Sequence, residues 1–364
     1  MQAYSRASRL LGVQYLRAAA ALMVAYCHLR IQIPAYTEYL TPLWAIDTDR
    51  LRGAVDVFFV ISGFVMMVTS QHLAPGTFFM RRIIRVAPLY WLLTCSLVAL
   101  ALVAPQLFRT TQVTPEFVLK SLLFVPYANP GQSGESVPLL VLGWTLNLEM
   151  FFYAIFAAAL FGPVRIQLVI VGAIFTMLVV TGALLPSLSR VPFFWFYARP
   201  MIMEFWLGMV IAHWYLRGSF RQIPVAACLA LVIGGIAALM ARAHVLGDSQ
   251  IAWTVPAVAI VLGAVALEQK RGIPYVGWLA LLGDASYSIY LTHIFTLGIT
   301  RSIWSSVRIG GSGHAALFAI TSMAAVAVAA VLAHRWVEEP LLRLSKRLIA
   351  VRRDVRVGVA VEPR

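Results

Sequence analysis

Residues 10–29 read LLGVQYLRAAAALMVAYCHL, an apolar run broken by few polar side chains. A helix that crosses the hydrocarbon core of a bilayer needs about 20 mostly apolar residues. The run therefore predicts a membrane-spanning helix that carries two basic residues, Arg17 and His28. Eleven helical steps separate them, which places their side chains about 20° apart on one face and roughly 16 Å apart along the axis.

The composition of the whole chain also indicates a membrane protein. Of its 364 residues, 61% are apolar and 12% are charged, whereas soluble domains average about 45–50% and 25%. A soluble or disordered chain is excluded, because so apolar a chain cannot cover itself with polar surface in water. The net charge of +14 lies mainly in short loops and in the tail. This pattern indicates topology signals and contacts with anionic lipid rather than nucleic-acid binding.

The sequence predicts an all-α, polytopic membrane protein, a bundle of about ten transmembrane helices. The expected spans are 10–29, 53–70, 83–104, 139–160, 164–184, 200–216, 224–241, 251–267, 276–299 and 315–334. Lys and Arg are more frequent in the loops on the side of the N-terminus, which places both termini in the cytoplasm. We expect one transmembrane domain over residues 1–340 and a basic cytoplasmic tail over residues 341–364.

An ionisable group inside a span is costly, so each one is a candidate functional residue. Asp56 lies near the outer end of the second expected span, at a depth similar to that of His28. If the two side chains meet, the carboxylate raises the basicity of the imidazole and fixes its tautomer, as a general base requires. The alternative is a hydrogen bond between helices without chemistry. Ser62 and Gly63, in the same span, form a small-residue patch that suits helix packing.

The third expected span begins with three arginines, Arg81, Arg82 and Arg85. Guanidinium groups gathered at one helix end can clamp phosphates, although they can also act only as markers of the cytoplasmic side. Glu149 falls near the middle of the fourth span, where an acid needs a cation or a proton. Its available partners are Arg17, the three arginines and His28, in either a structural or a functional pair.

Ser286, Tyr290 and His293 fall on one face of the ninth expected span. Such a stripe either forms hydrogen bonds between helices or contacts substrate. For Glu204 and for residues 334–340, which read HRWVEEP, structural pairing is the favoured interpretation. The three cysteines, Cys27, Cys95 and Cys228, lie inside apolar segments, and we expect them to be buried. They have no metal-ligand spacing, and we expect no metal site.

Five separated blocks resemble the motifs of the acyltransferase 3 family, the bacterial multi-pass membrane O-acyltransferases that decorate surface and exported polysaccharides. The blocks are Arg17-x10-His28, Asp56-Val-Phe-Phe-Val-Ile-Ser-Gly-Phe64, Arg81-Arg82-x2-Arg85-x2-Pro88-x-Tyr90-Trp91, Trp144-x4-Glu149-x2-Phe152-Tyr153 and Ser286-Tyr-Ser-x-Tyr290-Leu-x-His293. The resemblance covers about residues 10–340. It is strongest to the exopolysaccharide-production members, judged by the Gln14-Tyr-Leu-Arg17 opening and the Trp144-Thr-Leu-Asn-x-Glu149 block.

The resemblance implies an enzyme of the bacterial inner membrane that uses acyl-coenzyme A, most often acetyl-coenzyme A, as its cytoplasmic donor. No cofactor is expected to stay bound. The acceptor is a hydroxyl group of a polysaccharide or of a lipid-linked oligosaccharide, and the polysaccharide biosynthesis machinery is a further expected partner. No hydrolase-like domain follows the last span, so we expect no second periplasmic step.

The implied site residues follow from matching positions. The family's histidine and arginine map onto His28 and Arg17, and its arginine block maps onto Arg81, Arg82 and Arg85, which we expect to bind the phosphates of coenzyme A. Asp56 and Glu149 are the remaining expected catalytic residues. The expected substrate contacts are Tyr153, Ser286, Tyr290 and His293.

In the expected mechanism, the arginine cluster and His28 lie at opposite ends of one cavity, and the pantetheine arm of the donor passes Arg17 within it. His28 is oriented by Asp56 and removes the proton of a sugar hydroxyl, which attacks the thioester directly. Arg17 either binds the donor or stabilises the developing negative charge. An acyl-histidine relay is a variant. Two other classes stay open at this point: a proton-coupled transporter of a sugar or acyl precursor, and a membrane scaffold for a polysaccharide synthase.

Overall fold

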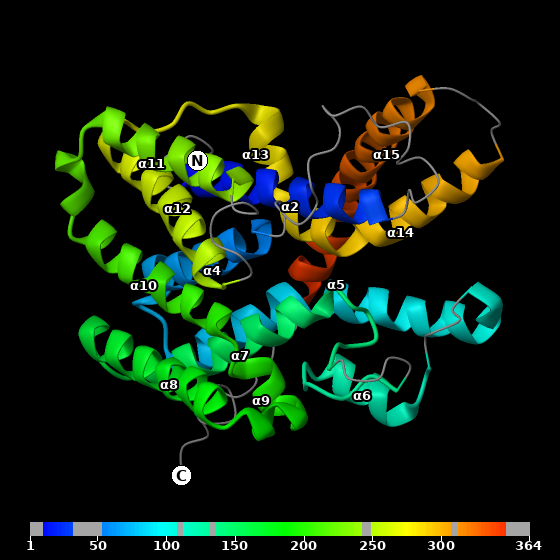
Figure 1. Cartoon of the computed structure of the whole chain (residues 1–364), viewed down its shortest axis with the longest axis horizontal. Coiled ribbons are helices and arrows are strands. Elements are labelled where there is room, and N and C mark those ends of the chain that lie inside the picture. The colour runs from blue at the N-terminus through cyan, green and yellow to red at the C-terminus, as the bar shows by residue number, and fades with distance from the viewer. Residues whose placement is uncertain are drawn as a thin grey trace, which may run out of the picture.

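The computed structural model describes residues 10–31, 53–107, 112–130, 136–241, 249–306 and 312–346. Within these ranges the chain forms helices and no strand, which confirms the all-α class. The α-helices are α2 (Leu11–Ile31), α4 (Ala54–Ser70), α5 (Pro75–Val103), α6 (Pro115–Leu122), α7 (Gly143–Ala159), α8 (Val164–Leu184), α9 (Pro192–Tyr197), α10 (Met203–Leu216), α11 (Val225–Ala241), α12 (Ile251–Arg271), α13 (Gly277–Asp284), α14 (Ser286–Ser305) and α15 (Ser312–Ala333). Figure 1 shows their arrangement.

Each of the ten expected spans falls on one or more of these helices. Within the described ranges, four helices are long and apolar enough to cross a membrane, and two shorter helices are also apolar. The four are Pro75–Val103, Val164–Leu184, Ile251–Arg271 and Ala316–Lys346. The membrane assignment is therefore supported, while the number of spans and the cytoplasmic position of the termini remain predictions. The last helix continues past the expected domain boundary at 340, and residues 347–364 lie outside the described part of the chain.

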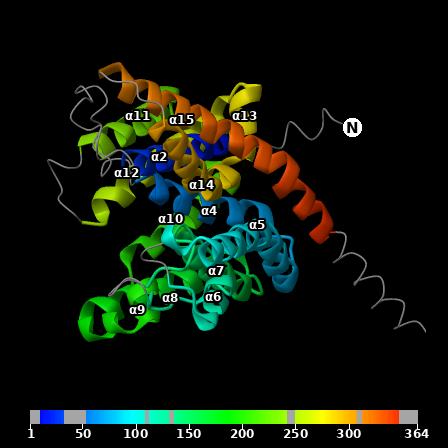
Figure 2. The same cartoon turned by 90° about the vertical axis from the view of Figure 1, so that its right-hand side faces the viewer.

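Helix α2 lies at the centre of one half of the molecule. It contacts α4, α12, α13, α14 and α15. In Figures 1 and 2, α2 and α11–α15 lie on one side and α6–α9 on the other, with α4, α5 and α10 between them. The side chains of α2 therefore meet residues from distant parts of the chain.

The ninth expected span is two helices rather than one. The chain turns at Ala285, between α13 and α14. At this turn the start of α2 packs tightly: Gln14 Nε2 donates to Asp284 Oδ1 at 2.7 Å. A Cβ on Gly283 would lie 2.6 Å from the carbonyl oxygen of Gln14. The break therefore accommodates the crossing of α2.

Helices α4 and α10 cross with their backbones almost in contact. A Cβ on Gly63 would lie 1.8 Å from the carbonyl oxygen of Phe205, and one on Gly208 would lie 2.0 Å from that of Val60. The packing role predicted for Gly63 is therefore confirmed, because only hydrogen fits at both positions.

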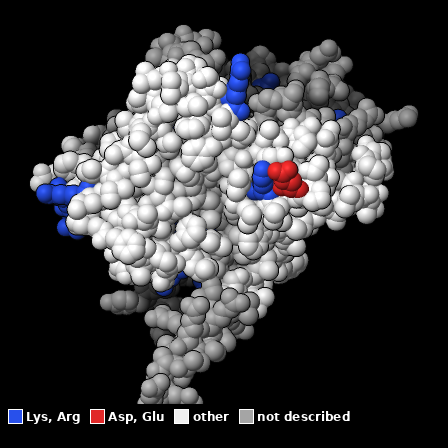
Figure 3. Space-filling view, turned by 90° about the horizontal axis from the view of Figure 1, so that it is seen from below, with Lys and Arg blue, Asp and Glu red and all other residues white. Residues whose placement is uncertain are grey.

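The face seen in Figure 3 bears very few charged residues. Large apolar side chains such as Leu102, Val103, Phe161 and Val169 are exposed on the described surface. So large an uncharged surface is unusual in water and suits a lipid environment. Cys95, in α5, is exposed rather than buried as expected.

Candidate active site

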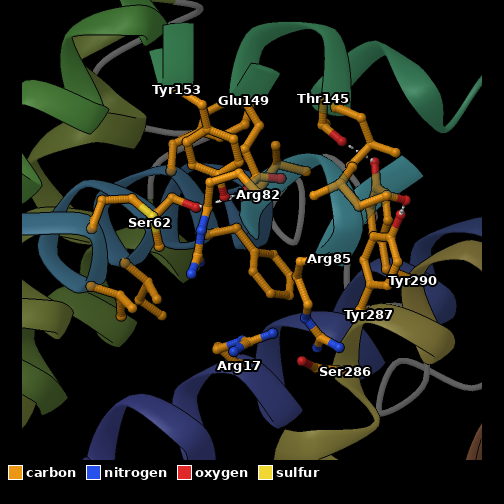
Figure 4. A pocket seen from close by; sticks show the side chains of 18 residues that line it. Arg17, Ser62, Arg82, Arg85, Thr145, Glu149, Tyr153, Ser286, Tyr287 and Tyr290 are labelled. Carbon is orange, nitrogen blue, oxygen red and sulfur yellow. Dashed lines mark hydrogen bonds between the residues drawn. The ribbon is translucent and has the colours of Figure 1, made fainter. Parts of the chain in front are cut away.

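A cavity of about 140 Å³ lies between α2, α4, α5, α7 and α14. Seven of the predicted site residues line it; they are Arg17, Arg82, Arg85, Glu149, Tyr153, Ser286 and Tyr290. Figure 4 shows Arg17 and Arg85 on one side of the cavity and Glu149, Ser62 and Tyr153 on the other, with Arg82 drawn beside the second group. The remaining wall is mostly apolar and comes from α4.

Two of the three arginines that were expected to bind phosphate line the cavity. Arg82 and Arg85 line the cavity, together with Arg17 from α2. Arg81 is exposed and does not line it. Arg81 and Arg85 lie on one side of α5, but Arg81 is one turn, about 6 Å, nearer the helix start. The prediction that Arg81 joins the clamp is therefore not supported by its position.

Glu338 holds Arg85 in place. Arg85 Nη1 donates to Glu338 Oε1, while Ser288 Oγ donates to Oε2 at 2.6 Å and His334 Nδ1 lies 2.9 Å from the same atom. Glu338 is 2% exposed and sits in a π-helical turn, His334–Glu338, after α15. The structural pairing expected for this segment is confirmed. Its link to Arg85, 253 positions away, had no sequence signal.

Glu149 faces the arginines across the cavity. Ser62 Oγ donates to Glu149 Oε1 at 2.7 Å, and the hydroxyl of Tyr153 donates to the same oxygen. Glu149 also interacts electrostatically with Arg17, as do Arg85 and Glu338. Glu149 is thus held by two hydroxyl groups and interacts electrostatically with Arg17, one of its expected partners.

Two polar groups on the cavity wall have no partner. Ser286 Oγ and Arg82 Nε are buried atoms without a hydrogen bond among the described residues. A buried polar group left unpaired costs free energy, about 1–3 kcal/mol. Such groups around a positively charged cavity are therefore suited to a ligand that carries acceptor oxygens.

Tyr290 closes the cavity toward His28. Its hydroxyl donates to Leu142 O at 3.0 Å and lies 2.7 Å from Thr145 Oγ1. The ring of Phe58 packs edge-on against Tyr290, with 6.2 Å between centroids. Phe58 also packs against a second apolar cluster, which contains Ala21. Along α2, Ala21 lies between Arg17 and His28.

His28 lies beyond this wall and contacts His293. Nδ1 of His28 is 2.9 Å from Val24 O and 3.2 Å from Nε2 of His293, and the ring centroids are 4.9 Å apart. His293 is fully buried, and its own ring lies 6.2 Å from that of Tyr290. The cavity lined by Arg17 does not include His28 or His293, so the expectation that the arginines and His28 share one cavity is wrong. Ser286 and Tyr290, on the same face of α14 as His293, line the cavity, while His293 contacts His28.

The predicted pairing of Asp56 with His28 is wrong. Asp56 Oδ1 accepts a hydrogen bond from Gln250 Nε2 at 2.6 Å. Gln250 also donates to the buried Glu204, at 3.0 Å, which accepts from Thr254 Oγ1 at 2.6 Å. Asp56 and Phe58 differ by two helical steps, about 200°, so α4 turns Asp56 away when Phe58 faces the cavity. The structural pairing expected of Glu204 is confirmed.

Helix α2 is fixed at its start by residues outside the cavity. The carboxylate of Glu268, in α12, accepts from the backbone N–H groups of Leu11 at 2.5 Å and of Gly12 at 3.2 Å. These N–H groups belong to the first helical turn, which has no partners within the helix. The hydroxyl of Tyr15 donates to Pro274 O and accepts from Val276 N. The anchors position Arg17, one turn further along.

Comparisons with known proteins agree on one family. A family model described as an acyltransferase domain matches residues 10–334. The chain is 40% identical over 297 residues to the exopolysaccharide production protein ExoZ of Rhizobium meliloti (strain 1021), covering 80% of this chain and 89% of that relative. It is 26% identical over 388 residues to the acyltransferase MdmB of Streptomyces mycarofaciens, covering 94% of each. No solved structure matches the chain.

Proposed function

The chain belongs to the acyltransferase 3 family of membrane acyltransferases, and from that premise we propose that it moves an acetyl group from cytoplasmic acetyl-coenzyme A to a hydroxyl of an exported or surface polysaccharide or of its lipid-linked precursor. It transfers acyl groups other than aminoacyl groups. The bacterial inner membrane is the proposed location, because such a donor and such an acceptor meet there.

The charge of the cavity supports a phosphorylated donor. Arg17, Arg82 and Arg85 line it, and the acids near them are Glu149 and Glu338. Arg85 is paired with Glu338, whereas Arg82 keeps an unpaired Nε. Guanidinium groups bind phosphate in a bidentate manner, so Arg82 and Arg17 are the proposed contacts of the phosphates of coenzyme A.

The separation of Arg17 and His28 divides their roles. The two residues lie roughly 16 Å apart along α2, further than an arginine side chain extends. Reacting atoms must approach to about 3–3.5 Å. Arg17 is therefore proposed to bind the donor, and not to stabilise charge on the thioester that His28 helps to attack. The pantetheine arm of the donor is long and thin and would bridge the two ends.

The proposed reaction is a direct transfer. Nε2 of His28 takes the proton of the sugar hydroxyl while the hydroxyl oxygen forms a bond with the thioester carbon. The carbon–sulfur bond then breaks, and the thiolate of coenzyme A receives the proton from His28. The products are the acetylated sugar and free coenzyme A, and His28 is restored.

The proposed acceptor is a hydroxyl of a polysaccharide or of its lipid-linked precursor. One relative is named as an exopolysaccharide production protein, and the chain covers 89% of it. His28 is near the C-terminal end of α2, the end that the predicted topology places at the outer side. A polysaccharide or lipid-linked hydroxyl would approach from there, and the polysaccharide biosynthesis machinery is the proposed partner.

The observation that carries the proposal is the cavity lined by Arg17, Arg82 and Ser286, in which Arg82 Nε and Ser286 Oγ have no hydrogen-bond partner among the described residues. We would incubate the purified protein with acetyl-labelled acetyl-coenzyme A and an oligosaccharide from the producing strain. Labelled sugar ester is expected from the wild type and from His72→Ala, which alters an exposed histidine. His28→Ala should bind the donor but form at least about 100-fold less ester. An unlabelled sugar with folded wild type, or normal turnover by His28→Ala, contradicts the proposal.

A further inference from the structure

We infer that His293 is the positioning residue for His28: it accepts a hydrogen bond from Nδ1–H of His28 and so keeps Nε2 of His28 unprotonated and directed at the acceptor hydroxyl. The inference rests on the proposed acyl transfer by His28. It assigns to a neutral imidazole the task that a carboxylate performs in many general-base pairs.

The hydrogen bonds determine where each proton lies. Val24 O is a carbonyl oxygen and can only accept, so Nδ1 of His28, at 2.9 Å from it, carries a proton. Ile289 O likewise can only accept, so Nδ1 of His293, at 3.1 Å from it, carries a proton. In a neutral ring the other nitrogen is then an acceptor. Nε2 of His293 therefore faces the proton of His28 with its lone pair.

The same reasoning leaves one nitrogen available for chemistry. With Nδ1 protonated, Nε2 of neutral His28 holds the free lone pair. Nε2 has no hydrogen-bond partner within the described ranges, and the side chain of His28 is partly exposed, whereas His293 is fully buried. His28 is thus the ring that a substrate can reach, and His293 is the ring that holds it.

The pair is fixed by one hydrogen bond within each of the two helices. Val24 and His28 are one turn apart on α2, and Ile289 and His293 are one turn apart on α14. When Nε2 of His28 takes the hydroxyl proton, Nδ1–H stays between Val24 O and Nε2 of His293, so the ring need not turn. A preorganised acceptor of this kind lowers the reorganisation that the step requires.

The kinetic test compares two substitutions of His293 with a control on the same helix. Glutamine places an acceptor oxygen near the position of Nε2, whereas leucine places none. His293→Leu should lower kcat about 30-fold, within the range for an impaired general base, while KM for acetyl-coenzyme A changes less than about twofold. His293→Gln should recover most of kcat. Thr296→Val, one turn further along α14, should match the wild type because Thr296 bonds only its own helix.

Two kinetic outcomes overturn the inference. If folded His293→Leu has the kcat of the wild type, Nδ1 of His28 needs no second acceptor. If His293→Gln is as slow as His293→Leu while both keep the melting temperature of the wild type, an acceptor at this position is not what matters.

A second measurement does not depend on turnover, so it still decides the inference if no acyl transfer is found. Ring-¹⁵N-labelled histidine in the full-length protein, assigned with His28→Asn and His293→Gln, reports which nitrogen of each ring is protonated. We expect a protonated Nδ1 and an unprotonated Nε2 in both rings, with a ¹⁵N–¹⁵N contact between Nδ1 of His28 and Nε2 of His293. The inference is overturned if Nε2 of neutral His28 is protonated, or if the wild type shows no contact between Nδ1 of His28 and Nε2 of His293.

Discussion

The rings of His28 and His293 lie 4.9 Å apart at their centroids, and the shortest distance between their nitrogens is 3.2 Å. This contact joins α2 to α14 outside the cavity. Arg17 lies on the same helix as His28, and Ser286 lies on the same helix as His293. The two helices therefore carry both the proposed donor-binding residues and the proposed base. Changes at either end are therefore expected to act through separate kinetic constants.

Arg82→Ala and Arg81→Ala should separate a binding arginine from a topology marker. Arg82 lines the cavity with an unpaired Nε, whereas Arg81 is exposed outside it. Loss of one charge-assisted contact to phosphate, about 1.5–3 kcal/mol, predicts a KM for acetyl-coenzyme A about 10- to 100-fold higher for Arg82→Ala. Arg81→Ala should change KM less than about twofold. Equal effects in steady-state kinetics would contradict the assignment.

Glu338→Gln should weaken donor binding through Arg85. The substitution keeps the shape of the side chain but removes the charge that pairs with Arg85 Nη1. We expect KM for acetyl-coenzyme A to change by about fivefold or more and the protein to lose about 1–3 kcal/mol of stability, because a buried charge-assisted hydrogen bond is lost. The matched control is Glu339→Gln, whose pair with Arg343 is largely exposed. A surface pair is worth about 0–1 kcal/mol, so thermal melting in detergent should barely change.

Gly63→Ala should disrupt the crossing of α4 and α10. The added Cβ would lie 1.8 Å from Phe205 O, a backbone atom that cannot move alone. A strong loss of folded protein is expected, at the upper end of about 1–3 kcal/mol for overpacking or beyond it. Gly234→Ala is the control, since nothing lies within 4 Å of its Cβ position. That change should be neutral or slightly stabilising by helix propensity. Similar melting temperatures for the two variants would show that α4 and α10 pack less tightly at Gly63 than the 1.8 Å approach indicates.

Asp56→Asn tests whether Asp56 acts on His28. Asparagine keeps the oxygen that accepts from Gln250, and its amide can donate toward Glu204. We expect kcat per folded molecule to stay within about threefold of the wild type, because Asp56 contacts Gln250 and not His28. The substitution should therefore leave the contribution of His28 as a general base, about 100-fold or more, unchanged. A fall in kcat as large as that of His28→Ala, at unchanged melting temperature, would restore Asp56 as the partner of His28.

Much of this arrangement was predictable from the sequence because lipid imposes a simple rule. Backbone groups in hydrocarbon must bond within their own helix, so the length and apolarity of a run indicate where a helix forms. Charged and polar residues inside such runs must turn inward, which is why Arg17, Glu149 and Ser286 could be expected in the interior. All three line the same cavity.

The partners of these residues could not be predicted in the same way. Equal depth in the membrane suggested that Asp56 meets His28, but depth does not fix the direction in which a side chain leaves its helix. The packing of Gly63 against Phe205 sets the rotation of α4 and turns Asp56 toward Gln250. Glu338 contacts Arg85 only because the segment after α15 packs beside α5. Contacts of this kind depend on helix order in space, which periodicity does not encode.

The aromatic wall of Phe58 and Tyr290 has a consequence for the energy supply of the cell. Bacteria store energy as an ion gradient across the inner membrane, and a continuous watery passage through an enzyme would discharge it. Tyr290 and Thr145, which are hydrogen-bonded to each other, line the cavity, whereas His28 does not. In the proposed acyl transfer, this wall would keep the cavity separate from the region of His28, so that the reaction would not open an aqueous path for ions.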